Sequence, residues 1–192
     1  MKNKITNILL AGVGGQGTLL ASEVLSEALM LGGYDVKKSE IHGMSQRGGS
    51  VTSHVRFGSK VYSPLIPEGE VDYLFGFELL ETLRCLPMLR PGGTVVVNDL
   101  KIMPAPVAMG QEIYPADVPA QIAGRFPDTV LVNGMDLAVQ AGNVRTVNIA
   151  LLGALSRRIN LPEQHWHQAL TRQVPELFLD ENLKAFELGR AV

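Results

Sequence analysis

The sequence is poor in cysteine: among its 192 residues only Cys85 carries a thiol. One thiol cannot close an internal disulfide, and it cannot supply the cysteine cluster that a zinc or iron–sulfur site needs. Cys85 lies among leucines in a predicted helix, which is typical of a buried and inert thiol. We therefore expect no metal site in this chain.

The sequence also lacks an excess of either charge and lacks long apolar runs. Its net charge is -2, with 17 basic and 19 acidic residues, so no strong field favours nucleic acid. No apolar run approaches the roughly 20 residues that a membrane span needs, and the first residues lack the long apolar core and cleavage motif of a signal peptide. These absences predict a cytoplasmic protein with no nucleic-acid or membrane partner.

Hydrophobic residues make up 46% of the chain, which provides enough apolar material for one sizeable core. We expect a single domain over residues 1–192, in which residues 160–192 form a helical C-terminal extension. Strand-like segments alternate with segments of helical periodicity, which indicates an α/β fold. The predicted architecture is a doubly wound, mainly parallel, Rossmann-like sheet with a β-hairpin excursion and a helical C-terminal third.

Several segments carry this prediction. Residues 50–57 alternate with period two, and residues 61–63 are expected to pair back on them as a hairpin. Other strands are predicted at residues 5–11, 34–39, 71–77, 94–98, 111–114 and 129–132. Helices are predicted at residues 18–31, 78–86, 119–126, 144–159, 162–173 and 181–188, and residues 100–110 are expected to be irregular.

A glycine motif lies between the first strand and the first helix. It comprises Gly12, Gly14, Gly15, Gln16 and Gly17 and matches the pattern G-x-G-x-x-G. The glycines permit a tight turn and a close approach of backbone to a phosphate, and the dipole of the following helix favours an anion. The alternative is a tight packing turn with no ligand.

Three enzyme classes use a similar turn, and each meets a difficulty here. A nicotinamide dehydrogenase or a methyltransferase places an acid at the end of the second strand. Glu40 lies beyond the usual spacing of about 20 residues, and Asp35 lies at the start of the strand rather than at its end. An adenylating enzyme usually adds paired cysteines. A free-standing nucleotide-binding module remains an alternative.

A second glycine-rich motif follows the second predicted strand. It comprises His42, Ser45, Gln46, Arg47, Gly48 and Gly49. The two motifs, in this order and at this distance, resemble the gamma-type domain of the 2-oxoacid:ferredoxin oxidoreductases. The residues around His42 and Arg47 are most similar to the beta subunits of members that act on arylpyruvates such as indolepyruvate. The likeness spans about residues 5–160 and includes residues 63–67, 76–78 and 143–155.

The resemblance implies a function. Members of this family oxidatively decarboxylate a 2-oxoacid to an acyl-coenzyme A and pass electrons to ferredoxin. Thiamine diphosphate and [4Fe-4S] clusters are expected on a larger alpha subunit, so this chain is expected to be inactive alone and to hold no cofactor by itself. Coenzyme A is the expected co-substrate. Gamma subunits for pyruvate, branched-chain oxoacids or 2-oxoglutarate are the nearest alternatives.

The two motifs are expected to meet at the carboxyl edge of the sheet, where open α/β sheets bind ligands. Arg47 offers a planar cation, and Gly48 and Gly49 allow backbone N–H groups to face an anion, either a phosphate of coenzyme A or a cofactor phosphate presented by the alpha subunit. Alternatively, Arg47 pairs with an acid at a subunit interface, and the glycines merely open a strand.

Other side chains have two interpretations each. His42 is a candidate for proton transfer or substrate contact, or else a polar anchor. Glu78 either faces the site from the end of a parallel strand or stabilises the start of the next helix. His165 and His167 point to different helix faces and make a poor metal pair. Met44, Met103 and Met109 suit contact with a partner protein or gap filling in the core.

Overall fold

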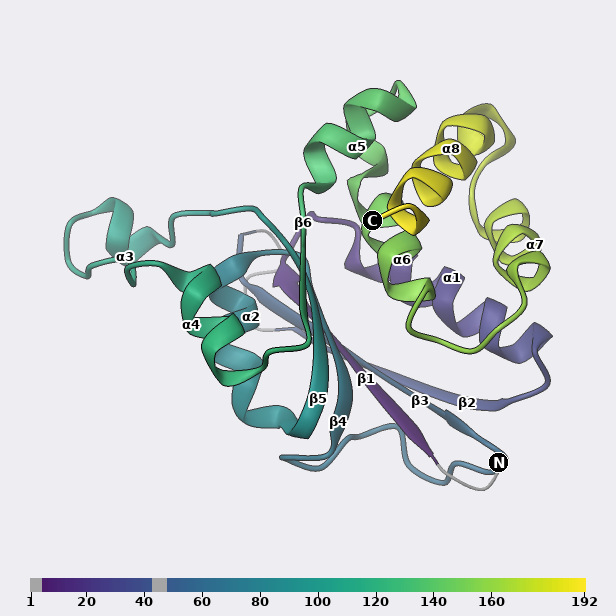
Figure 1. The fold of residues 1–192 in the computed structure, drawn as a ribbon, viewed down its shortest axis with the longest axis horizontal. Helices are drawn as coiled ribbons and strands as arrows, with labels where there is room; N and C mark the ends of the chain where they lie inside the picture. Colours follow the sequence, from purple (N-terminus) through teal and green to yellow (C-terminus); the bar gives the residue numbers. More distant parts are fainter. Residues whose placement is uncertain (1–4, 43–47) are drawn as a thin grey trace.

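The computed structural model describes residues 5–42 and 48–192, which form an α/β fold around a six-stranded sheet (Figure 1). The strand order is β2-β3-β1-β4-β5-β6. The pairs β1–β4, β4–β5 and β5–β6 are parallel, and β3 runs antiparallel to both β1 and β2. The predicted fold class is confirmed.

The strands are β1 (Thr6–Val13), β2 (Asp35–His42), β3 (Ser50–Gly58), β4 (Val71–Gly76), β5 (Leu89–Asn98) and β6 (Thr129–Val132). The α-helices are α1 (Thr18–Leu31), α2 (Leu79–Cys85), α3 (Ala105–Ala108), α4 (Val118–Arg125), α5 (Gly134–Ala141), α6 (Val147–Ser156), α7 (Glu163–Gln173) and α8 (Leu179–Arg190). Three 3-10 turns are η1 (Leu86–Met88), η2 (Val144–Thr146) and η3 (Glu176–Phe178).

The sheet separates two layers of helices because successive side chains of a strand point to opposite faces. In β1, Ile8 and Leu10 join the larger hydrophobic core, which packs against α1, α6, α7 and α8. Leu9 and Ala11 point the other way, into the smaller core beneath α2 and α4. Figure 1 shows the two helical layers on either side of the strands. Burial on both faces explains the near-continuous apolar run of β1.

Several sequence predictions are wrong in detail. Residues 61–63 form no strand, and β3 finds its antiparallel partners in β1 and β2 instead. Residues 111–114 also form no strand, because this segment belongs to an excursion that carries α3 away from the sheet (Figure 1). The helices α3 and α5 were not predicted, and α3 lies within residues 100–110, which were expected to be irregular. The first helix has the predicted bounds, Thr18–Leu31, and ends at Gly32.

The C-terminal helix is part of the core and packs closely on α6. A Cβ atom added to Gly189 would lie 1.8 Å from the Ala150 carbonyl oxygen, and one added to Gly153 would lie 2.1 Å from the Phe186 carbonyl oxygen. Backbone therefore meets backbone where the two helices cross. Among the described residues, no helix is long and apolar enough to cross a membrane.

Candidate functional site

The two glycine segments meet at the carboxyl end of β1. The Gly14 N–H donates to the Gly49 carbonyl oxygen at 2.9 Å, and the Gly48 N–H donates to the Gly14 carbonyl oxygen at 3.4 Å. This contact exists because β3 is antiparallel to β1, so β3 starts at the edge where β1 ends. The predicted proximity of the two segments is confirmed at Gly48 and Gly49.

Gln16 fixes the shape of the first turn. Its Oε1 accepts a hydrogen bond from the Val13 N–H at 2.6 Å, and its Nε2 donates to the Phe77 carbonyl oxygen at 3.0 Å. Both ends of the amide are therefore used within the protein, and they tie the end of β1 to the end of β4. Gln16 is a positioning residue for the glycine turn, and its amide is not free to bind a ligand in this conformation.

The N-terminus of α1 is open to an anion. Its N-cap residue Gly17 has a left-handed φ of 76° and offers no side-chain cap, and the first turn contains no acidic residue. The first N–H groups of a helix lack intrahelical partners and carry partial positive charge. Asn148 packs against this turn, and its Nδ2 donates to the Gly17 carbonyl oxygen at 3.2 Å.

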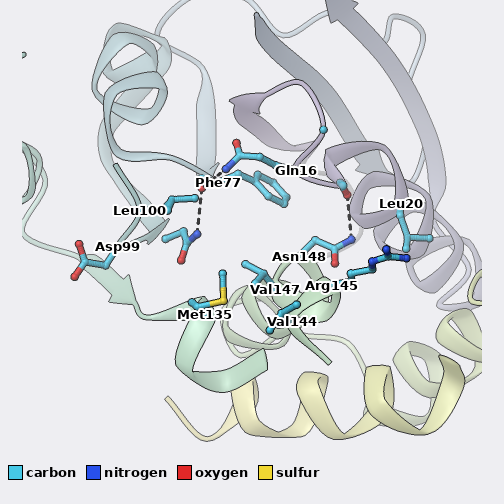
Figure 2. Close-up of a pocket in the computed structure, with 13 residues that line it drawn as sticks. Gln16, Leu20, Phe77, Asp99, Leu100, Met135, Val144, Arg145, Val147 and Asn148 are labelled. Atoms are coloured by element: carbon cyan, nitrogen blue, oxygen red, sulfur yellow. Dashed lines mark hydrogen bonds between the residues drawn. The ribbon is translucent and has the colours of Figure 1, made fainter. Parts of the chain in front are cut away.

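A cavity of about 540 Å³ opens beside the turn, on the side of β4 and β5 (Figure 2). This is the switch point of the sheet, because β1 leads through α1 to one edge while β4 and β5 extend toward the other. The apolar walls come from α1, α5, α6 and the ends of β4 and β5. They are formed by Leu20, Phe77, Leu100, Met135, Val144 and Val147.

Few polar groups of the cavity lack partners. Asn98 is satisfied, since its Nδ2 donates to the Phe77 carbonyl oxygen and its Oδ1 accepts from the Gly134 N–H. In the part of the chain that the structure describes, the Arg145 guanidinium makes no hydrogen bond or ion pair. Arg145 is exposed at the cavity, and Figure 2 shows it beside Leu20. The buried Oδ1 of Asn148 also has no partner there.

Glu78 has a clear structural role. It is 1% exposed, and its carboxylate accepts hydrogen bonds from the Glu81 N–H, the Ile102 N–H and the Tyr114 hydroxyl at 2.8, 3.0 and 3.1 Å. Burial, followed by the charge and hydrogen bond of Glu78, raises the pKa of Tyr114, so its hydroxyl stays a donor. Of the two interpretations, this geometry favours the one in which Glu78 caps α2.

Some predicted site residues lie outside the described residues. Ser45, Gln46 and Arg47 belong to this group, as does Met44. The backbone of His42 is described and pairs with Val51 at the end of β2, which places it at the same edge as the glycine turn. Met103 and Met109 are 51% and 63% exposed, so they do not fill gaps in the core.

Three further titratable side chains, Cys85, His54 and His167, have structural explanations. Burial, followed by the nearby charge of Glu81, raises the pKa of the Cys85 thiol to about 11, which suits an inert cysteine. His54 accepts a hydrogen bond from the Ile66 N–H at its Nδ1. His167 contacts Glu187 and Glu163, but Arg190 already pairs with both carboxylates. This group therefore reads as an ion-pair network between α7 and α8.

Sequence reasoning missed Arg145 and Asn148 as site residues. Both lie in a stretch that carried the family resemblance, residues 143–155, but nothing in its local pattern indicates that it contacts the glycine turn. The contact joins residues 131 positions apart, Gly17 and Asn148. The one available signal was the presence of an arginine just before an otherwise apolar helix and of an asparagine in its first turn.

Together, the fold and the site define a Rossmann-like domain with a candidate ligand site, the glycine turn, at the carboxyl edge of its sheet. The model of the pyruvate ferredoxin/flavodoxin oxidoreductase family matches residues 7–192. The chain belongs to this family of oxidoreductases. The match extends through the C-terminal helices, beyond the residues 5–160 over which the resemblance was expected.

Relatives of known name support this membership. The chain is 41% identical over 191 residues to the indolepyruvate oxidoreductase subunit IorB of Pyrococcus horikoshii, covering 95% of this chain and 93% of the relative. It is 34% identical to the protein of the same name from Methanothermobacter thermautotrophicus over 187 residues, covering 95% of each chain. Its identity to the common gamma subunit of the pyruvate/ketoisovalerate oxidoreductases of Thermococcus litoralis is 28%, over 76% of this chain and 74% of the relative.

Solved structures agree on the fold. The gamma subunit of a keto/oxoacid ferredoxin oxidoreductase from Geobacter sulfurreducens superposes with a TM-score of 0.72 at 24% identity, covering 96% of this chain and 95% of that chain. The 2-oxoglutarate:ferredoxin oxidoreductase from Magnetococcus marinus superposes with a TM-score of 0.74 at 22% identity. That match covers 98% of this chain but 31% of the larger one.

Proposed function

We propose that this chain is the beta subunit of an indolepyruvate:ferredoxin oxidoreductase. The observation that carries the proposal is the 34–41% identity to indolepyruvate oxidoreductase subunits over 95% of the chain. The complete enzyme would convert an arylpyruvate and coenzyme A to the arylacetyl-coenzyme A, carbon dioxide and a proton. The two electrons released would reduce ferredoxin.

The redox cofactors of this reaction belong on a partner, in our proposal. The only thiol of this chain is Cys85, whose pKa is raised to about 11 by burial and by Glu81, so the residues present do not fit an iron–sulfur cluster. We therefore place the [4Fe-4S] clusters and thiamine diphosphate on an alpha subunit that forms a hetero-oligomer with this chain. Ferredoxin would interact with the complex through that subunit.

The role of this chain is to bind and orient an anionic part of coenzyme A at the carboxyl edge of the sheet. The open N-terminus of α1 and the neighbouring Gly48 and Gly49 support this role. The sequence indicates Arg47 as the candidate cation of the same anion-binding site. His42, at the end of β2, remains a candidate for substrate contact.

Replacing Arg47 tests this assignment. In the assembled enzyme, Arg47→Ala should raise the KM for coenzyme A by about tenfold or more, as expected when one charge-assisted hydrogen bond is lost. The KM for indolepyruvate should change little. An unchanged KM for coenzyme A in a fully assembled complex would contradict a role of Arg47 in binding coenzyme A.

The function itself is tested by co-expression with the large subunit of a related indolepyruvate oxidoreductase. We expect a brown complex that reduces ferredoxin or a viologen dye only when indolepyruvate and coenzyme A are both present. The same complex should be compared with pyruvate, 2-oxoglutarate and branched-chain oxoacids. Preference for one of these would favour the alternative of a gamma subunit for another 2-oxoacid, whose relatives are less similar.

A stand-alone nucleotide-binding module is the alternative from another class. It predicts that the isolated chain binds a nucleotide tightly and forms no complex with the large subunit. Size-exclusion chromatography of the co-expressed chains distinguishes the two, because only the subunit hypothesis predicts co-elution.

A further inference from the structure

The cavity beside the glycine turn combines an apolar interior with an unpaired cation. Its walls are mainly aliphatic and aromatic, and its volume of about 540 Å³ lies in the range of small-molecule sites. The site is distinct from the Gly48–Gly49 side of the turn, since it opens over β4 and β5. A site for a phosphate alone would not need the apolar walls of this cavity.

The polar groups of the cavity indicate the charge of its ligand. Arg145 lies at the cavity with no ion pair or hydrogen bond in the described residues, and the helices that start there, α1 and α6, have no acidic residue in their first turns. Helix N-termini and a free guanidinium both favour an anion. Asp99, exposed at the rim, is the one carboxylate among the lining residues.

A second, independent observation concerns the side chain of Asn148 in the cavity wall. The residue is 4% exposed, and its Oδ1 is buried without a hydrogen-bond partner, while its Nδ2 is held by Gly17. A buried acceptor without a donor destabilises the protein, and such atoms usually find a partner in a water or a ligand. A small shift of this side chain on ligand binding would allow an N–H or O–H donor to satisfy it.

We propose that this cavity binds a flat aromatic ring system that bears a hydrogen-bond donor and is attached to an anion, with Arg145 contacting the anion and Asn148 the donor. Two molecules of the proposed reaction share this chemistry: an indole-containing acid and the adenine nucleotide end of coenzyme A. The choice of these two sources rests on the proposed function, whereas the chemistry of the cavity follows from its own residues.

Binding to the full-length chain is measured by isothermal titration calorimetry with indole-3-acetate and, separately, with adenosine 3′,5′-bisphosphate. Binding of the first alone assigns the aryl acid, and binding of the second alone assigns the nucleotide. Benzothiophene-3-acetate, which lacks the N–H donor, should bind several-fold more weakly than indole-3-acetate, and indole-3-acetamide, which lacks the charge, should bind about tenfold more weakly. Absence of binding by both anionic probes at millimolar concentration would overturn the proposal.

Variants locate the binding. Arg145→Gln should weaken the anionic probe that binds by about tenfold or more, whereas Arg157→Gln, an exposed arginine at the other end of α6, should leave its affinity unchanged. Met135→Trp should block the cavity, and Val139→Trp, one turn further along α5 and outside the cavity, should not. Equal affinities across each matched pair would overturn the assignment to this cavity.

These outcomes are separable from those of the proposed function. If the chain binds a probe in an Arg145-dependent manner but forms no active complex with the large subunit, the cavity assignment stands and the subunit function fails. If the complex turns over indolepyruvate but neither probe binds the chain, the subunit function stands and the cavity assignment fails.

Discussion

Single residues at the glycine turn are constrained by contact as well as by backbone conformation. Gly17 has a left-handed φ of 76°, and a Cβ atom there would lie 2.6 Å from the Asn148 Nδ2. Gly33 has a similar φ of 81°, but a Cβ atom there would meet nothing within 4 Å. A comparison of alanine substitutions at the two positions therefore separates the cost of backbone strain from the cost of steric overlap.

We expect Gly17→Ala to lower the free energy of unfolding by about 2–4 kcal/mol, because backbone strain and displacement of Asn148 add together. Gly33→Ala should cost about 1–2 kcal/mol from strain alone. Urea denaturation of both variants measures the difference. Equal losses would mean that Asn148 moves aside freely, which would contradict a firm contact between α6 and the glycine turn.

The titration of His54 should make the free energy of unfolding depend on pH. Burial, and then the charge of Arg56, hold the pKa of His54 below its usual value, and its Nδ1 accepts the Ile66 N–H in the neutral form. As the pH falls below about 6.5, the imidazole of the unfolded chain takes up a proton before that of the folded chain does. The unfolded state then binds more protons, so the free energy of unfolding should fall as the pH drops.

The contribution of His54 is measured by urea denaturation between pH 7.5 and 5. The wild-type chain should lose stability across this range, and His54→Gln should show a shallower loss, since glutamine can accept the same N–H without titrating. A variant with the same slope as the wild type would contradict the assignment to His54.

At the scale of elements, the packing of α8 on α6 depends on two glycines. Gly189→Ala should lower the free energy of unfolding by about 2–4 kcal/mol, because its Cβ atom would collide with the Ala150 carbonyl and force the helices apart. Gly124, in α4, has open space around it, so Gly124→Ala should leave stability unchanged or raise it by about 0.5–1 kcal/mol. Thermal or urea unfolding compares the two, and a neutral Gly189→Ala would refute the close crossing.

Elements were predictable from the sequence where local signals and burial agreed. The helix α1 has a clear apolar periodicity and is bounded by Gly17 and Gly32, so its limits were predicted correctly. The helix α5 has eight residues and starts with a glycine, and its cap by Asn133 was the available signal. The partners of β3 are β2, which directly precedes it in the chain, and β1, which lies beyond α1, and local alternation within β3 specifies neither of them.

The candidate site was predictable in part for the same reason. The glycine turn and the Gly48–Gly49 segment each consist of consecutive residues, so each can be recognised in the sequence. Their expected proximity follows from the rule that ligands bind at the carboxyl edge. The cavity is assembled from the ends of several elements, and Arg145 reaches it from a 3-10 turn before α6. Such convergence is a property of the tertiary fold.

At the scale of the whole molecule, the proposed division of labour predicts where iron resides. The isolated chain, purified without oxygen, should be colourless and contain less than about 0.1 iron atom per chain, because it has one cysteine where a cluster needs about four. Complex formation with the large subunit should yield brown material. Iron analysis and absorption spectra measure both, and stoichiometric iron in the isolated chain would contradict the proposal.

The reciprocal backbone bonds between Gly14 and residues 48–49 also matter for protein engineering. A chimaera that grafts residues 43–49 from a relative with another substrate would keep its fit only if residues 12–17 came from the same parent. The two peptides form one exchangeable module, although the 25 residues 18–42 separate them along the chain. Because these bonds join main-chain atoms, any such exchange has to preserve the backbone conformation of Gly14 and of residues 48–49.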